Sequence, residues 1–213
     1  MIDLRKKMEG KNVAGVLIAV LIFLMMVGCM NIRRSETISD SRVSKEQFSS
    51  KTVAVLPVKA QSTFAPDALM PLRMALNEKL DEKVREKITG ANIVDTKTSV
   101  NILNDKGKIE ILDDIIKTYD NTGVFDKRLV ESLGNILKSD YTVFSRLKAE
   151  KTDAGILGKG FASSLQIIIL ENAKNEMVWA GSGEFQRGGV FGFGSTENKQ
   201  AAEELVNLAF EKF

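Results

Sequence analysis

The sequence contains no histidine and a single cysteine, Cys29, among its 213 residues. Zinc sites built from His or Cys clusters are therefore excluded, as are Ser-His-Asp catalysis, Cys-His catalysis and an internal disulfide. Prolines number only 3, while 44% of the residues are hydrophobic and 27% are charged. This is the composition of a globular protein, and it excludes collagen-like, mucin-like and fully disordered chains.

Positive charge is in excess only at the N-terminal end. The chain has 30 basic and 28 acidic residues, a net charge of +2. Residues 1–28 contain this whole surplus, which comes from Arg5, Lys6, Lys7 and Lys11 set against Asp3 and Glu9. The remainder, 29–213, is neutral overall, so no domain-wide positive field attracts nucleic acid by counterion release. A nucleic-acid partner is not expected.

An apolar stretch follows the basic residues. Residues 13–27 (VAGVLIAVLIFLMMV) carry no charge. A membrane-spanning helix needs about 20 apolar residues, whereas the apolar part of a secretory signal has about 7–15. The stretch ends in Met26-Val27-Gly28-Cys29, with a small residue directly before the cysteine. This ending resembles the lipobox of bacterial lipoproteins, with Met26 where such motifs usually carry Leu.

The lipobox resemblance implies that residues 1–28 are a signal peptide and that Cys29 becomes the acylated first residue. A diacylglyceryl group with a further acyl chain, such as palmitate, is a stable anchor, because two or more chains bind membranes far better than one. Met30 rather than Asp follows the cysteine, which favours an outer-membrane lipoprotein facing the periplasm; inner-membrane retention stays open. An uncleaved signal anchor and a buried structural cysteine are the alternatives.

Residues 29–50 are expected to be the lipidated cysteine and a flexible tether. They are polar, serine-rich and without helical or strand periodicity. The folded unit is expected to span 51–213, a length sufficient for one well-buried core.

The folded part alternates strand and helix patterns. Residues 52–58 (TVAVLPV) are almost wholly apolar, as in a central strand, and 91–94 form a second strand. Apolar steps of three and four predict a long helix from Pro66, with Gly90 just beyond its end. The patterns predict shorter helices at 99–103, 109–119 and 126–137, three strands at 141–147, 162–170 and 177–185, and a last helix from about Glu197.

This order predicts a single α/β domain whose mixed parallel and antiparallel sheet of about five strands is packed by helices. Helices that follow the early strands imply parallel crossovers. The hairpin expected at 171–176 adds antiparallel strands.

Catalytic, cofactor-binding and metal-binding residues are not predicted. Asp113 and Asp114 are adjacent, so on a helix they diverge by about 100° and cannot share a substrate. The glycines of 155–160 lack the spacing of a phosphate-binding loop, and those of 188–194 lack the order of a dinucleotide fingerprint. Phe191 and Phe193 alternate with glycines there and could form a partner contact. Trp179 is expected in the core.

Several segments resemble a family of bacterial envelope lipoproteins that share the fold of CsgG, LpoB and the TolB amino-terminal domain. The segments are TVAVLPV (52–58), NIVD (92–95), SVNILND (99–105), LGNILKSDYTVFSRL (133–147) and LQIIILENAKNEMVWAGSGEF (165–185). The resemblance implies this α/β fold over 51–213 and a role in binding.

Function is therefore expected to lie in protein binding. The first hypothesis is a non-enzymatic, lipid-anchored periplasmic adaptor or assembly factor in an envelope complex. A component of a CsgG-type secretion channel is the alternative, and an enzyme or small-ligand site at the strand ends ranks last. Neither 148–161 nor 180–195 has room for the spanning hairpin of about 20 residues that such a channel adds. The partner's identity and a homo-oligomer stay open.

Overall fold

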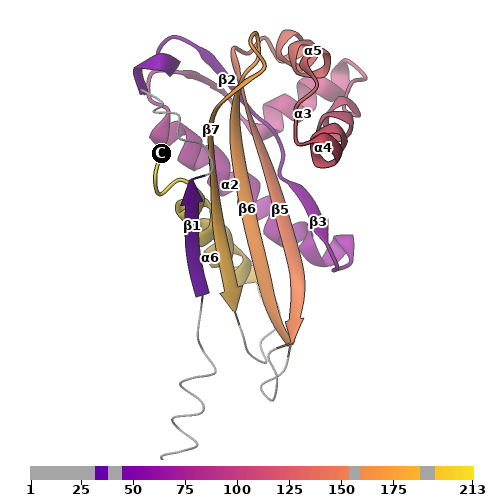
Figure 1. Cartoon of the computed structure of the whole chain (residues 1–213), viewed down its shortest axis with the longest axis vertical. Coiled ribbons are helices and arrows are strands. Elements are labelled where there is room, and N and C mark those ends of the chain that lie inside the picture. The colour runs from indigo at the N-terminus through magenta and orange to yellow at the C-terminus, as the bar shows by residue number, and fades with distance from the viewer. Residues whose placement is uncertain (1–31, 38–44, 154–158, 188–194) are drawn as a thin grey trace, which may run out of the picture.

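The computed structural model describes residues 32–37, 45–153, 159–187 and 195–213. The expected signal peptide at 1–28, the expected lipid attachment residue Cys29 and the Gly/Phe segment 188–194 lie outside the described residues. Seven strands and five α-helices are assigned in the described part. The fold is α/β with a mixed sheet, as predicted, and Figure 1 shows helices packed against both faces of that sheet.

The first half of the chain builds β1 (Ile32–Thr37), the 3₁₀ helix η1 (Lys45–Phe48), β2 (Thr52–Val55), β3 (Lys59–Ser62), α2 (Pro66–Lys87) and β4 (Asn92–Val94). The second half builds α3 (Thr96–Asp105), α4 (Ile111–Thr122), α5 (Lys127–Leu137), β5 (Tyr141–Asp153), β6 (Lys159–Glu171), β7 (Glu176–Arg187) and α6 (Ser195–Ala209). Each helix and strand predicted from periodicity is present, with its ends shifted by a few residues.

The strands lie in the order β1-β7-β6-β5-β2-β4, and β3 also pairs with β5. β2 runs parallel to β4 and β5, and β3 runs parallel to β5. The pairs β5–β6, β6–β7 and β1–β7 are antiparallel. The sheet has seven strands rather than about five because the polar segments β1 and β3, which carry no apolar alternation, pair through their backbones.

Two hydrophobic cores sandwich the sheet. Val53 and Val55 of β2 pack with α2 and α6, whereas Ala54 and Leu56 pack with α3, α4 and α5. Since successive side chains of a strand point to opposite faces, β2 is buried on both sides. This explains the continuous apolar run at its position in the sequence.

The segment expected to be a flexible tether, 29–50, differs from that expectation where the structure describes it. Ile32–Thr37 pairs antiparallel with β7, and the Phe48 side chain is fully buried. The Phe48 ring packs edge-on against that of Tyr141, with ring centroids 4.9 Å apart. A lone aromatic residue in a polar segment gives no periodic signal, so the sequence pattern did not indicate its burial.

The strands β5 and β6 are longer than predicted. The sequence pattern ends the first of these strands near Leu147 and begins the second near Ala162. In the structure their pairing continues as far as Asp153, which lies opposite Lys159. In this extension Ala149 is fully buried, while Lys148 and Glu150 are exposed. One face of the extended strands therefore packs on the core and the other carries charged groups. Within the described ranges, no helix is long and apolar enough to cross a membrane.

Candidate functional site

A polar area covers one face of the sheet, at the end of the long strands farthest from α3, α4 and α5. We call it the open face. Its members share one face of the strands, and all but the buried Ser182 are exposed or half-buried; they are Arg34 and Glu36 of β1, Arg146, Lys148 and Glu150 of β5, Ala162, Ser164 and Gln166 of β6, and Ser182, Glu184 and Gln186 of β7.

The strand register aligns these side chains in rows. Lys148 pairs with Ser164, which pairs with Glu184, which pairs with Arg34. A second row joins Arg146, Gln166, Ser182 and Glu36 in the same way. Directly paired residues on one face lie close enough to interact, so each row crosses four strands as a continuous surface.

The helices leave this part of the sheet uncovered. Farther along the strands, the same face carries Phe144, Ile168 and Ala180, which pack under α3, α4 and α5. Figure 1 shows these helices gathered at one end of the sheet, with the lower halves of β5, β6 and β7 clear of them. The opposite face is closed, since Ala149 and Leu165 pack with α2 and α6.

Charges of both signs lie on the open face. The Lys148 ammonium and the Glu150 carboxylate form an ion pair at 2.9 Å, and both side chains are largely exposed. Arg34, Glu36 and Glu184 are exposed as well. Surface ion pairs of this kind add little stability, about 0–1 kcal/mol. The arrangement of positive and negative charges is therefore more important for recognising a partner than for stabilising the fold.

Small side chains on β6 make the open face concave. Ala162 lies between Glu150 and Gln186, Ser164 lies between Lys148 and Glu184, and the resulting hollow measures about 270 Å³. The walls include Lys148 and Glu150 on one side and Glu184 on the other. A shallow trough with charged walls suits a protruding segment of a protein partner.

Side-chain contacts of Arg146 mark where the open face meets α4. Its guanidinium pairs with Asp120 and lies over the ring of Tyr119, with 5.3 Å from Cζ to the ring centroid. It also donates to Gln166 Oε1 at 3.3 Å, and the Gln61 amide donates to Asp120 at 2.7 Å. These contacts tie α4 to β3 and β5, so the edge of the open face is held in place.

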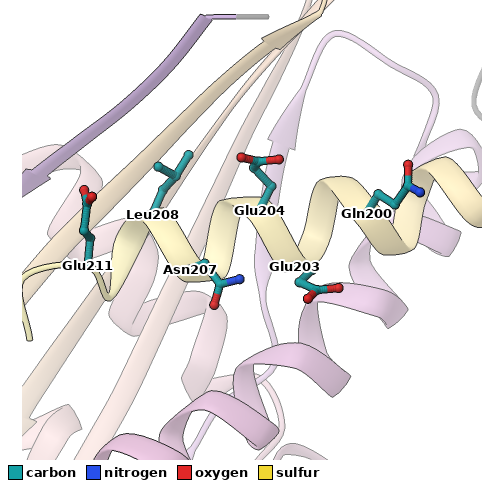
Figure 2. Close-up of a pocket in the computed structure, with 6 residues that line it drawn as sticks. All are labelled: Gln200, Glu203, Glu204, Asn207, Leu208 and Glu211. Atoms are coloured by element: carbon teal, nitrogen blue, oxygen red, sulfur yellow. The ribbon is translucent and has the colours of Figure 1, made fainter.

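A second exposed surface follows α6. Gln200, Glu203, Glu204, Asn207, Leu208 and Glu211 line a wide depression of about 570 Å³. Figure 2 shows Glu203 and Asn207 on one side of the helix, and Glu204, Leu208 and Glu211 on the other. Glu211 accepts a hydrogen bond from the Ser35 hydroxyl of β1. This depression is acidic and open, without the mixture of groups that acid–base chemistry requires.

The acidic residues of α2 and α4 are dispersed. Asp113 and Asp114 are exposed in the first turn of α4, and Asp113 pairs with Lys59. The Asp81 carboxylate accepts hydrogen bonds from the backbone and hydroxyl of Thr96, at 3.0 and 2.8 Å. Its partial burial raises its pKa, an effect that the Thr96 hydrogen bonds oppose. In the described part of the chain, no group of three His, Cys, Asp or Glu residues could hold a metal ion.

Trp179 lies in the core, as predicted. Its side chain is only 2% exposed and stacks on Phe210, with ring centroids 5.2 Å apart. Cys29, Phe191 and Phe193 lie outside the described residues.

The sequence pattern does not predict the open face, because it ends one strand at Leu147 and begins the next at Ala162, which leaves 148–161 as the connection between them. One signal for it is present: Lys148, Ala149 and Glu150 alternate polar and small as a half-buried strand does. Which residues of β1 and β7 lie on the same face as Lys148 and Glu150 depends on the order of the strands, and the alternation does not predict that order.

No protein-family model matches the chain, and no curated protein matches it. Solved structures with a similar fold include the PelC dodecamer from Paraburkholderia phytofirmans, with 13% identity, TM-score 0.43 and coverage of 83% of this chain and 92% of that one. Lipoprotein GNA1162 from Neisseria meningitidis has 12% identity, TM-score 0.43 and coverage of 71% and 93%. The LpoB C-terminal domain from Escherichia coli has 11% identity, TM-score 0.37 and coverage of 64% and 83%.

LpoB is one of the proteins whose fold the sequence resembles, and GNA1162 is a lipoprotein by name. The likeness concerns the fold and carries no assignment of function.

Proposed function

We propose that the chain is a lipid-anchored periplasmic adaptor or assembly factor of a bacterial envelope complex, and that it binds another envelope protein through the open face. The observation that carries this proposal is the uncovered face itself. Four strands present a row of charged and small side chains, formed by Lys148, Ser164, Glu184 and Arg34, that no helix of the described fold covers. The chemistry of this row suits recognition, and we propose no catalytic role.

The anchor is the second part of the proposal. Residues 1–28 act as a signal peptide, and Cys29 becomes the acylated first residue of the mature protein. The apolar stretch 13–27 and the small residue before the single cysteine support it. Two or more acyl chains then hold the domain stably at a membrane. The outer membrane, on its periplasmic side, is the location that Met30 favours.

The partner that fits the open face is a periplasmic protein segment with charges of both signs. Lys148 and Arg34 require acidic groups opposite them, while Glu150 and Glu184 require basic ones. Complementary charges increase the rate of association and exclude wrong partners more than they add affinity. A trough of this size receives a protruding loop or an extended strand, whose small contact predicts a transient complex.

Site-specific photocrosslinking in living cells tests the binding face. A photoreactive residue is placed at Lys148, Ser164 or Glu184 on the open face, and at Asn135 on α5 or Glu203 on α6 as controls. We expect one envelope protein to be crosslinked from the open-face positions and not from the controls. The double charge reversal Lys148→Glu with Glu184→Lys should abolish that crosslink while the melting temperature stays within a few degrees.

Equal crosslinking from the control positions, or a crosslink that survives the double reversal, would refute the open face as the binding surface. The mass of the crosslinked species separates the alternatives. One copy joined to a different protein supports an adaptor, whereas a closed ring of many copies supports a channel component instead.

A further inference from the structure

A cleft lies at the carboxyl end of β2, apart from the open face. It measures about 330 Å³, and its walls come from the segment 56–59, from α2, α3 and α4, and from Phe144 and Ser145 of β5. β2 stands between its parallel neighbours β4 and β5. The connection from β2 to β4 packs α2 on one face of the sheet, and the connection from β4 to β5 packs α3, α4 and α5 on the other.

This placement is a topological switch point. Where consecutive connections leave parallel strands toward opposite faces, the loops separate and a crevice opens at the carboxyl ends. Small-molecule sites in open α/β sheets occur at such crevices. Its position alone makes the cleft a candidate ligand-binding site, and the residues that line it indicate the kind of ligand it binds.

Two cations line the cleft. The Arg73 Nε atom donates to the carbonyl oxygen of Val58 at 3.3 Å, and among the described residues no acceptor engages the terminal nitrogens of this guanidinium. Lys59 contacts Asp113, whose side chain is 65% exposed and therefore well solvated. Burial, and then the positive charge of Arg73, lower the pKa of Lys59. The two cations thus repel each other, and an anion beside them would relieve that repulsion.

Ser145 borders the cleft through its place in β5, but its hydroxyl points away from it. The side chain shares the face of Val143 and Leu147, opposite that of Phe144, and its Oγ atom is inaccessible to solvent. Arg73 is therefore the polar group that the cleft offers to an anion. Glu110 at the mouth of the cleft is exposed, so its charge is screened by water.

The rest of the lining is apolar; it includes Leu56, Val58, Val100, Leu112, Ile116 and Phe144. A volume of about 330 Å³ is at the lower end of small-molecule sites. The cleft therefore suits a compact ligand with an aliphatic body and one anionic group.

We propose that this cleft binds a small carboxylate with an aliphatic body, its carboxylate at Arg73 and its chain among the apolar side chains. The C-terminal residue of a peptide and a free N-acylated amino acid share this chemistry. The inference does not depend on the open face, and either proposal can fail alone.

Titration of the full-length protein in detergent micelles with N-acetyl-leucine, followed by NMR and by calorimetry, tests the cleft. We expect saturable binding, and binding weaker by about tenfold or more for N-acetyl-leucinamide, which has the same shape without the charge. A pentapeptide that ends in leucine separates the two sources. Binding as tight as that of N-acetyl-leucine indicates a peptide terminus, and weaker binding indicates a free small molecule.

Two variants and a control complete the test. Arg73→Met and the cleft-filling Val100→Phe should each weaken the binding of N-acetyl-leucine by about fivefold or more, and Lys127→Met on α5 should leave it unchanged. Val100 is half-buried in the cleft wall, so Val100→Phe should remain folded even if Arg73→Met does not. Absence of saturation up to about 10 mM, equal affinity for the amide, or unchanged affinity in Val100→Phe would overturn the proposal.

Discussion

Gly183 of β7 lies so close to α6 that a Cβ atom at this position would be 2.6 Å from the carbonyl oxygen of Leu205. Real Cβ atoms do not approach backbone atoms this closely, so the absence of a side chain permits the helix to pack on the strand. Gly181, two residues earlier, has the same relationship to Ala209, at 2.3 Å from its carbonyl oxygen. The Gly-Ser-Gly sequence at 181–183 therefore provides the surface of β7 on which α6 packs.

Gly183→Ala should destabilise the protein by about 2 kcal/mol, because α6 must move away from β7 to admit the methyl group. Guanidinium unfolding followed by the fluorescence of Trp179 measures this, since Trp179 is the single tryptophan and is buried. Gly107→Ala is the control: its φ is +60° and nothing lies within 4 Å of a Cβ there, so only backbone strain of about 1 kcal/mol is added. An equal loss in the two variants would contradict close packing at Gly183.

Phe48→Ala should cost about 4 kcal/mol, since its fully buried ring packs on Tyr141 in the main core. Circular dichroism during chemical unfolding gives the free energy. Val124→Ala, at a side chain that is 64% exposed, should change stability by about 0.5 kcal/mol or less. If the two substitutions have the same small effect, the folded unit begins after Phe48, as its polar surroundings in the sequence suggested.

Acidification should lower the free energy of unfolding, because it protonates the Asp140 carboxylate. The Thr52 backbone N–H donates to its carboxylate at 2.8 Å, and this hydrogen bond, with Lys51 nearby, lowers the pKa of Asp140 below its ordinary value of 3.8. A carboxyl group with a lowered pKa in the folded state stabilises the fold above 3.8, and this stabilisation is lost as the pH falls through the folded value. Unfolding curves at several pH values between about 6 and 2 will measure the loss.

Asp140→Asn should therefore be less stable than the parent protein at neutral pH and should lose less stability on acidification. Asp105→Asn, at an exposed residue of α3, should retain the parent's pH dependence. Parallel pH profiles for the parent and Asp140→Asn would contradict the assigned role of the Thr52 hydrogen bond.

Cys29→Ala should leave the protein without acyl chains and release it from membranes, because the proposed anchor consists of those chains. Mass spectrometry of the intact protein and membrane fractionation measure the two effects. Membrane retention of the unacylated variant, at the level of the parent protein, would instead favour the uncleaved signal anchor.

Periodicity within the sequence determined the elements and their type. The apolar run at 52–58 indicated a strand buried on both sides, since hydrophobic burial selects such runs wherever both faces are covered. The stripes of α2 and α5 indicated one packed face each, and Asp126, the first residue of the expected helix 126–137, is the N-cap of α5. These signals are local, because side chains a few residues apart share a helix face or a strand face.

Tertiary structure decided the rest. Arg34, Lys148 and Glu184 share one surface only because β1, β5, β6 and β7 are neighbours in a particular register. Lys59, Arg73 and Phe144 meet at one cleft only because β2 ends between helices on opposite faces. Register and strand order arise from backbone hydrogen bonds between distant segments, and the composition of either segment alone does not encode them. The sequence by itself therefore determined what each segment forms, and the packing of those segments created both candidate surfaces.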